Sequence, residues 1–171
     1  TIALEKEPSN NVYKFYLAVA KDSLGQRDEA IELLEESIAS GDEIPENYNY
    51  LGYIYVEENR DLDRAIELIK KAIDLDPENG AYIDSLAWAY YKKGMLDEAL
   101  EEAQKALEYM PEDPVIISHL GDIYFARGEV KEAIRQWNRA LKKDPENKSL
   151  KEKIKKAKEE FEKDTGGKKY K

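Results

Sequence analysis

The sequence predicts an all-α protein in which pairs of antiparallel helices stack one after another along the chain. Two observations lead to this fold class. Charged residues make up 37% of the 171 residues, and most of them are Glu and Lys, which are good helix formers. In addition, residue types recur along the chain at a spacing of 34 residues, a period that is typical of helical-repeat proteins.

Six columns of matching residues carry this period in the second half of the chain. The pairs are Leu86 and Leu120, Tyr90 and Tyr124, Gly94 and Gly128, Ala99 and Ala133, Ala106 and Ala140, and Pro111 and Pro145. Three earlier members of the same columns are Ala65, Ala72 and Pro77. A further copy runs from Leu17 through Gly25 to Ala30, so the pattern indicates four units.

Two columns of small residues would let the two helices of each unit approach closely. They are Ala18, Gly52, Ala87 and Gly121 in the first helix, and Ala30, Ala65, Ala99 and Ala133 in the second. The turn between the helices has a column of its own, made of Gly25, Asn59, Gly94 and Gly128. A helix often ends in a left-handed residue, which Gly allows and Asn tolerates.

Two further columns belong to the contacts between units. The prolines Pro77, Pro111 and Pro145 are expected to stop the second helix and lead into the next unit. The tyrosines Tyr55, Tyr90 and Tyr124 are expected to fill the gap between neighbouring units.

The period divides the chain into four predicted repeats. They cover residues 11–44, 45–79, 80–113 and 114–147. The second repeat has one extra residue at its turn, in the segment ENRDLDRA, because Ala30 and Ala65 lie 35 positions apart. The first repeat departs from the pattern at Ser37 and Asp42, where Ala and Pro are expected.

The first ten residues are in register with the end of a preceding repeat. Ala3 lies 34 residues before Ser37, and Pro8 lies 34 residues before Asp42. Residues 1–10 are therefore predicted to be the end of a second helix, and the chain a fragment or cleavage product of a longer array.

The C-terminal part is predicted to form a cap. Residues 148–163 read as a charged helix with one apolar stripe, formed by Leu150, Ile154, Ala157 and Phe161. Stacked repeats need such a helix to cover the last exposed core face, and this interpretation is favoured over binding of nucleic acid or anionic lipid by the basic run KEKIKKAK. Residues 164–171 are expected to be a disordered tail.

These columns resemble the tetratricopeptide-repeat (TPR) family over about residues 11–147. The segments SHLGDIYFARG and QWNRAL are similar to TPR proteins of bacteria, some of which are envelope lipoproteins. The resemblance implies a right-handed superhelical stack of helix pairs, an α-α superhelix, whose first helices line the concave face. It leaves the compartment open between the cytoplasm and the bacterial envelope or periplasm, since a signal or anchor would lie upstream of residue 1.

The resemblance also implies which first-helix residues face the concave groove. These are Phe15, Tyr16 and Val19; Asn49, Tyr50, Tyr53 and, as a further candidate, Val56; Asp84, Ser85, Trp88 and Tyr91; and Ser118, His119, Asp122 and Phe125. Tyr and Trp are common anchors of protein interfaces because they offer a large contact area at low entropy cost. We therefore interpret the chain as a protein–protein interaction scaffold that binds a peptide or partner helix in an aromatic-lined groove.

The alternative interpretation is structural. Several of these aromatic residues would then be interior, and the chain would be a solenoid segment of a larger multidomain protein or enzyme, used through its edges. Its N-terminal edge, left open by the partial repeat, could also support self-association.

One subtype of the family can be tested on the sequence. Some members bind the C-terminal carboxylate of chaperones through a clamp of Lys, Arg and Asn on successive first helices. The groove positions here carry Phe15, Tyr50, Asp84, Ser85 and His119 instead, and Asn49 alone resembles the clamp. A chaperone-tail adaptor is therefore not expected.

The sequence predicts no enzyme activity, no cofactor and no metal site. Ser118, His119 and Asp122 lie close together, but adjacent helical residues point about 100° apart, so Ser118 cannot face His119. Asp122 could hydrogen-bond His119. The chain has no Cys and no Gly-rich phosphate loop, and its adjacent Glu pairs are expected to be solvated.

Charge is uneven along the chain and bears on the kind of partner. The net charge of the whole chain is −10. Residues 148–171 carry a net charge of +5, so the other residues together carry −15. An acidic body disfavours nucleic acid and favours a basic or neutral protein partner. No stretch approaches the roughly 18 apolar residues of a membrane span, so no membrane partner is predicted.

Overall fold

The computed structural model describes residues 11–41 and 43–164, and within this part of the chain the regular structure is entirely α-helical. The helices are α2 (Asn11–Ser23), α3 (Arg27–Ala39), α4 (Pro45–Glu57), α5 (Leu62–Leu75), α6 (Gly80–Lys93), α7 (Leu96–Tyr109), α8 (Pro114–Ala126), α9 (Val130–Lys143) and α10 (Lys148–Asp164). Their order gives four helix pairs followed by one last helix. The all-α fold class is therefore confirmed.

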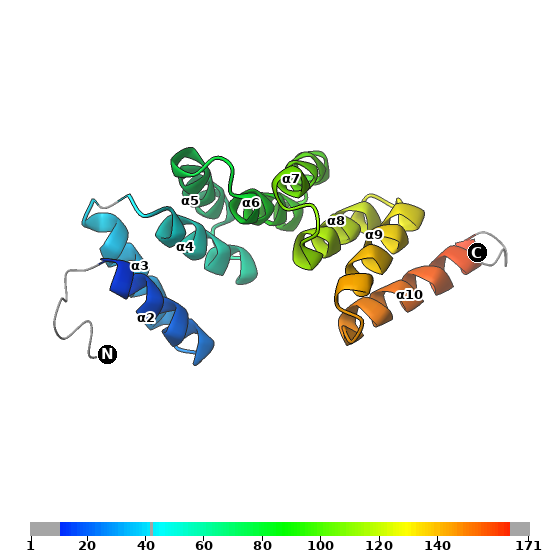
Figure 1. The fold of residues 1–171 in the computed structure, drawn as a ribbon, viewed down its shortest axis with the longest axis horizontal. Helices are drawn as coiled ribbons and strands as arrows, with labels where there is room; N and C mark the ends of the chain where they lie inside the picture. Colours follow the sequence, from blue (N-terminus) through cyan, green and yellow to red (C-terminus); the bar gives the residue numbers. More distant parts are fainter. Residues whose placement is uncertain (1–10, 42, 165–171) are drawn as a thin grey trace.

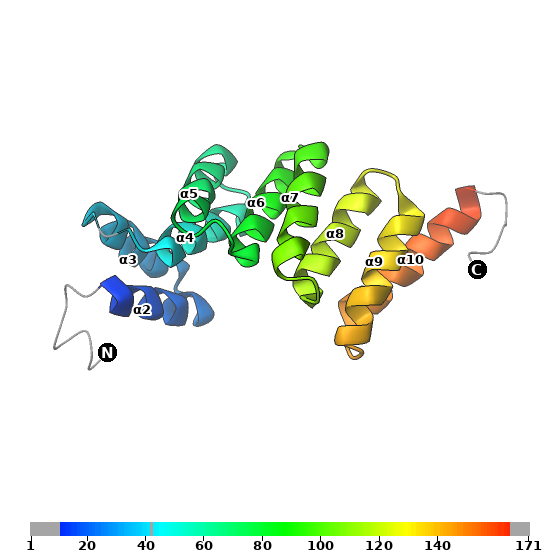
Figure 2. The ribbon, with the colours of Figure 1, turned by 45° about the horizontal axis from the view of Figure 1, so that its top comes forward.

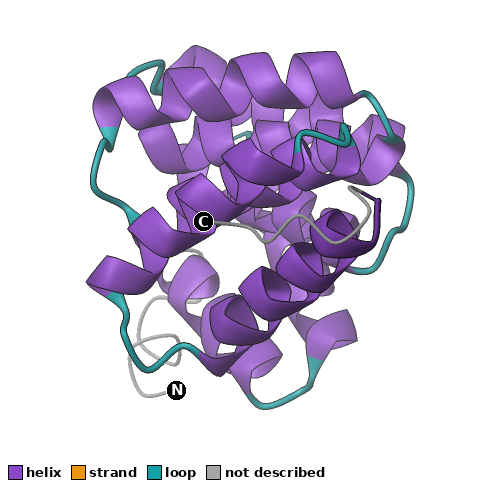
Figure 3. Ribbon diagram, turned by 90° about the vertical axis from the view of Figure 1, so that its right-hand side faces the viewer, coloured by secondary structure: helices purple, strands orange, loops and turns teal. Residues whose placement is uncertain are grey.

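The helix pairs form an arch (Figure 1). Helices α4, α6 and α8 lie on its inner side, and α5 and α7 lie on its outer side. The pairs follow one another in sequence order from one end to the other (Figure 2), and short loops join the helices (Figure 3). Because α4 contacts α6 and α6 contacts α8, these three first helices form a continuous concave surface.

The turn within each helix pair has left-handed backbone at the predicted column. The φ angles are 77° at Gly25, 52° at Asn59, 80° at Gly94 and 79° at Gly128. The extra residue of the second repeat follows Asn59, where Asp61 is also left-handed, with a φ of 39°. Its carboxylate accepts a hydrogen bond from the Arg64 amide at 3.2 Å, which caps the start of α5.

The two columns of small residues are buried where the helices of a pair meet, as predicted. A Cβ atom on Gly52 would lie 2.6 Å from Cγ1 of Ile69, and one on Gly121 would lie 2.5 Å from the indole of Trp137. These distances are too short for real contacts. Each of the two glycines therefore makes room for a large side chain on the facing helix.

The tyrosine column links each repeat to the one before it, which confirms the prediction. The Tyr55 hydroxyl donates a hydrogen bond to Glu35 of α3 at 3.0 Å. Tyr90 lies under the Lys70 ammonium of α5, and the Tyr124 hydroxyl accepts a hydrogen bond from Gln104 of α7. The three partners, Glu35, Lys70 and Gln104, occupy one equivalent position in successive second helices.

Ser37, which stands where the repeat pattern has Ala, forms a buried polar contact at the junction of α3 and α4. Ser37 and Asn47 are both fully buried, and Nδ2 of Asn47 donates a hydrogen bond to Oγ of Ser37 at 2.7 Å. At the junction of α7 and α8 the equivalent positions are occupied by Ala106 and Ile116, which pack in an apolar cluster. A polar pair thus replaces an apolar contact in the first junction.

The last helix, α10, buries its apolar stripe against α9. Leu150, Ile154 and Ala157 belong to one core cluster with residues of α9, and Phe161 is half-buried. The helix ends at Asp164, so the prediction that the tail begins at residue 164 is wrong by one residue. The predictions for residues 1–10, Asp42 and 165–171 lie outside the described residues.

Candidate functional site

Two adjoining pockets on the concave surface collect most of the groove residues predicted in the third and fourth repeats. Trp88 and Asp122 line both pockets. Tyr91 and Phe125 line only the larger pocket, and Ser118 and His119 line only the smaller one. Two further candidates, Asp84 and Ser85, are buried beneath this surface.

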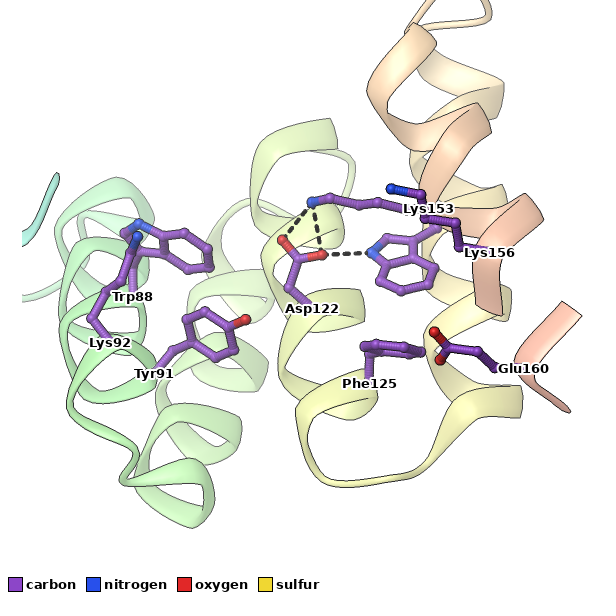
Figure 4. A pocket seen from close by; sticks show the side chains of 9 residues that line it. Trp88, Tyr91, Lys92, Asp122, Phe125, Lys153, Lys156 and Glu160 are labelled. Atoms are coloured by element: carbon purple, nitrogen blue, oxygen red, sulfur yellow. Dashed lines mark hydrogen bonds and ion pairs between the residues drawn. The ribbon is translucent and has the colours of Figure 1, made fainter. Parts of the chain in front are cut away.

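The larger pocket has a volume of about 390 Å³ and lies between α6, α8 and α10 (Figure 4). Its lining residues are Trp88, Tyr91 and Lys92 of α6, Asp122 and Phe125 of α8, Trp137 of α9, and Lys153, Lys156 and Glu160 of α10. Aromatic rings thus form its apolar surface, and charged groups from α6 and α10 stand on opposite sides of it.

Trp88 is held in place by contacts on its ring and at its nitrogen. Its ring centroid lies 4.6 Å from that of Tyr91 and 4.2 Å from that of His119, and both pairs are stacked. Its Nε1 donates a hydrogen bond to Glu57 at 2.9 Å, and the Lys92 ammonium lies 5.0 Å from the ring centroid. Trp88 is therefore a preorganised surface in the centre of the groove.

The Asp122 carboxylate joins α8 to the two helices that follow it. Its Oδ1 accepts a hydrogen bond from Nε1 of Trp137 at 3.0 Å, and Nζ of Lys153 lies 2.8 and 2.7 Å from its two oxygens. The suggested bond between Asp122 and His119 is therefore wrong. His119 instead pairs with Asp84 of the preceding repeat, with 2.8 Å between Nδ1 and Oδ2.

The smaller pocket has a volume of about 260 Å³ and lies toward the start of α8. Pro114, Val115, Ser118 and His119 line it from α8, Asp144 and Asn147 from the loop between α9 and α10, and Leu150 from the first turn of α10. It shares Trp88, Asp122 and Lys153 with the larger pocket. The two pockets therefore form one groove, divided by these three side chains.

None of the candidates of the first two repeats lines these pockets, and three of them, Phe15, Tyr50 and the 66% exposed Tyr16, form ring contacts with one another. Phe15 meets Tyr50 edge to face at 5.9 Å and Tyr16 at 5.5 Å between ring centroids. The Tyr50 hydroxyl donates a hydrogen bond to Asp22 at 2.9 Å, and Nε of Arg27 donates to the same carboxylate at 2.7 Å. Burial is the main cause that raises the pKa of Tyr50 to about 12, and the bond to Asp22 adds to it.

The remaining candidates of these repeats differ in exposure. Val19, Asn49 and Tyr53 are half-buried on the first helices. Burial, and next the nearby Glu57 carboxylate, raise the pKa of Tyr53. Val56 is fully buried in the core and does not face the groove. Val56 follows Tyr53 by three residues, a spacing that places both on roughly one helix face, so helical spacing alone did not reveal that Val56 is buried.

Sequence reasoning missed five residues that line the larger pocket. They are Lys92, Trp137, Lys153, Lys156 and Glu160. The last three lie at positions i, i+3 and i+7 of the helix that was predicted only to be a cap, and they form a polar face beside its apolar stripe. That spacing was visible in the sequence and could have indicated a second exposed face directed at the groove.

Among the described residues, no cluster of three or more His, Cys, Asp or Glu side chains could hold a metal ion. None of their helices combines the length and the apolar character needed to cross a membrane.

The sequence matches two family models of the tetratricopeptide repeat. One covers residues 15–80 and the other covers residues 90–155, so that together they account for most of the chain. No curated protein sequence matches it.

Solved structures with the same fold include three that differ in context. A thermophilic TPR protein of Thermus thermophilus has a TM-score of 0.78 at 23% identity, over 91% of this chain and 84% of that one. A chain of the APC/C hetero-tetramer Cut9–Hcn1 has a TM-score of 0.80 at 22% identity, over 87% of this chain and 30% of that one. The first TPR domain of Spaghetti, bound to an HSP90 peptide, has a TM-score of 0.62 at 23% identity, over 67% of this chain and 90% of that one. With its repeated columns, its arch of helix pairs and both sequence matches, the chain belongs to the tetratricopeptide-repeat family and is a helical-repeat scaffold of the kind on which proteins interact.

Proposed function

We propose that this protein binds an extended segment of a partner protein on its concave surface, with the larger pocket taking one large side chain of that segment. The observation that carries the proposal is the pocket of about 390 Å³ between α6, α8 and α10. Its aromatic surface comes from Trp88, Tyr91, Phe125 and Trp137. Because Trp88 is already fixed by stacking and hydrogen bonding, a ligand would bind it without much loss of conformational entropy.

The size of the pocket favours an extended segment over a helix. Ligand pockets commonly span about 300–1,000 Å³, so this one lies near the lower end of the range. It suits a single aromatic or large aliphatic side chain. A helix in a groove needs a row of anchors along several turns. The smaller pocket, which shares Trp88, Asp122 and Lys153, offers a place for the next part of an extended chain.

The comparison with solved structures supports a peptide as the class of ligand. The first TPR domain of Spaghetti has this fold and is bound to the HSP90 peptide SRMEEVD. At 23% identity the likeness concerns the fold, so the sequence of that peptide is not carried over to this chain. The chemistry of a ligand for this protein is therefore inferred from the residues that line its own pocket.

Selection from a library of displayed random peptides on the immobilised protein would test the proposal. We expect the selected peptides to share one large apolar residue. They should also change the intrinsic fluorescence, since both tryptophans of the chain line the larger pocket. Trp88→Ala should weaken their binding, measured by calorimetry, by about 2 kcal/mol or roughly 30-fold, as for a typical interface anchor.

Tyr109→Ala is the matched control, because Tyr109 is an exposed aromatic residue at the end of α7, outside both pockets. It should leave the affinity unchanged, and circular dichroism should show that both variants keep their helical content. Equal binding of the selected peptides by the two variants would place the binding surface elsewhere and refute the proposal.

A further inference from the structure

The larger pocket has a local charge that differs from the charge of the whole protein. The chain carries −10 in total, yet three lysines line this pocket: Lys92 from α6, and Lys153 and Lys156 from α10. Two carboxylates, Asp122 and Glu160, line it as well. Charges on the distant repeats are screened beyond about 10 Å at 0.1 M salt, so a bound ligand responds mainly to the groups that line the pocket and to Glu57, whose carboxylate accepts the Trp88 indole bond at 2.9 Å.

These five charged groups are not equally available to a ligand. Both oxygens of Asp122 are engaged by Lys153, and Oδ1 also accepts the Trp137 indole bond. Lys153 and Asp122 therefore neutralise one another. Lys92 and Lys156 are exposed, and neither forms an ion pair within the described part of the chain. The pocket thus presents two ammonium groups against the single carboxylate of Glu160.

The two available lysines lie across the pocket from one another, on α6 and on α10 (Figure 4). The Lys92 ammonium lies over the Trp88 ring, 5.0 Å from its centroid. An anionic group at the mouth of the pocket would therefore meet cations on both sides, while an apolar side chain beside it could reach the aromatic rings.

We infer that the pocket recognises a partner segment in which a carboxylate side chain stands next to a large apolar residue. The apolar residue packs on Trp88, Tyr91 and Phe125, and the carboxylate lies between Lys92 and Lys156. This inference rests on the proposed function and adds the chemistry of the ligand. It differs from the basic partner that net charge predicts, because α10 supplies local positive charge to an otherwise acidic protein.

The decisive probe is a set of synthetic peptides with blocked termini, made from a sequence selected on the wild-type protein. In one member every Asp and Glu is changed to Asn and Gln, and in another every apolar anchor is kept while Lys replaces the acidic residues. We expect the amide peptide to bind about fivefold more weakly than the acidic one, and the lysine peptide more weakly still. Added salt should weaken binding of the acidic peptide more than binding of the amide peptide.

A pair of double variants assigns the effect to the pocket. Lys92→Gln/Lys156→Gln should lower the affinity for the acidic peptide about fivefold and leave that for the amide peptide unchanged. Lys148→Gln/Lys155→Gln makes the same change in net charge at exposed positions of α10 outside both pockets, and should have little effect.

The possible outcomes separate this inference from the proposed function. If acidic and amide peptides bind equally and Trp88→Ala still weakens both, the groove binds peptides and the inference about charge is wrong. Equal losses in the two lysine double variants would show a general charge effect and would also overturn it. If Trp88→Ala changes nothing, the proposed function fails together with the inference.

Discussion

The two halves of the concave surface are built from the same repeat but differ in what they offer a ligand. In the first two repeats Tyr50 is bound to Asp22 and meets Phe15 edge to face, and no groove candidate there lines either pocket. In the last two repeats the first helices and α10 enclose two pockets around Trp88. The two halves share one backbone fold, so the difference between them comes from a few side chains.

One column of the second helices accounts for much of this difference. Leu34, Ile69, Ala103 and Trp137 occupy equivalent positions, and all are buried. In the second repeat Ile69 fills the space over Gly52, whereas in the fourth the larger Trp137 lies over Gly121 and also reaches the pocket and Asp122. This packing position lines the larger pocket in the fourth repeat, whereas Leu34, Ile69 and Ala103 line neither pocket.

The largest effect that tests this comparison is expected from Trp137→Ala. Removing the buried indole should lower the free energy of unfolding by about 3–5 kcal/mol, because it leaves a cavity over Gly121 and takes a hydrogen-bond donor from Asp122. Urea denaturation followed by circular dichroism would measure it. Binding of the selected peptides should weaken too, since the pocket loses part of its floor.

Ile69→Ala provides the matched control at the equivalent position of the second repeat. It should also destabilise the protein, by about 2–5 kcal/mol, but it should leave peptide binding unchanged because Ile69 lines neither pocket. If the two variants weakened binding to the same extent, the contrast between the two halves of the groove would not hold.

A smaller effect is expected at the junction of α3 and α4. Asn47 is fully buried, and its Oδ1 makes no hydrogen bond within the described part of the chain. Ser37→Ala also removes the acceptor for Nδ2 of Asn47. It should lower the free energy of unfolding by about 1–3 kcal/mol. The double variant Ser37→Ala/Asn47→Ile copies the apolar junction formed by Ala106 and Ile116 and should be close to neutral or stabilising.

Denaturation of both single variants and the double variant gives a double-mutant cycle. The double variant should be more stable than Ser37→Ala alone. Additive losses from the two single changes would mean that Ser37 and Asn47 are not energetically coupled, which would contradict the expectation that the apolar pair restores the stability lost in Ser37→Ala.

The repeat columns made most of the fold predictable. Gly25, Gly94 and Gly128 correctly predicted left-handed backbone at the turns, and Asn59 was correctly placed in the same column. These predictions succeeded because the backbone conformation depends on the residue itself. The register of the small residues similarly fixed which helix faces meet.

The pockets were less predictable because they depend on residues that are distant in sequence. Trp88 was a groove candidate, but nothing local indicates that His119 stacks on it or that Lys156 lies across the pocket from Lys92. Asp122 and His119 lie one helical turn apart and were expected to be able to pair. Asp122 instead pairs with Lys153 of α10, and His119 pairs with Asp84 of α6. Tertiary packing decided these contacts, and helical spacing did not.

The smallest effect concerns the first half of the groove, where Tyr50 is tied to Asp22. Burial is the largest cause that raises the pKa of Tyr50 to about 12, followed by the hydrogen bond to Asp22. Asp22→Asn removes the negative charge, so the pKa of Tyr50 should fall, yet it should stay above the ordinary value near 10 because burial remains. NMR of protein labelled in its tyrosine rings would follow the titration, with Tyr50→Phe identifying the signal.

The sign of the linked stability change follows from these values. An unfolded chain ionises Tyr50 near pH 10, whereas the folded chain keeps it neutral until about pH 12. The contribution of Tyr50 to stability is therefore complete below pH 10 and is lost as the pH rises from about 10 to about 12. Tyr50→Phe should flatten this part of the stability profile relative to wild type. A titration near 10 in the folded protein would mean that Tyr50 is solvated, and that the first half of the groove is as open as the second.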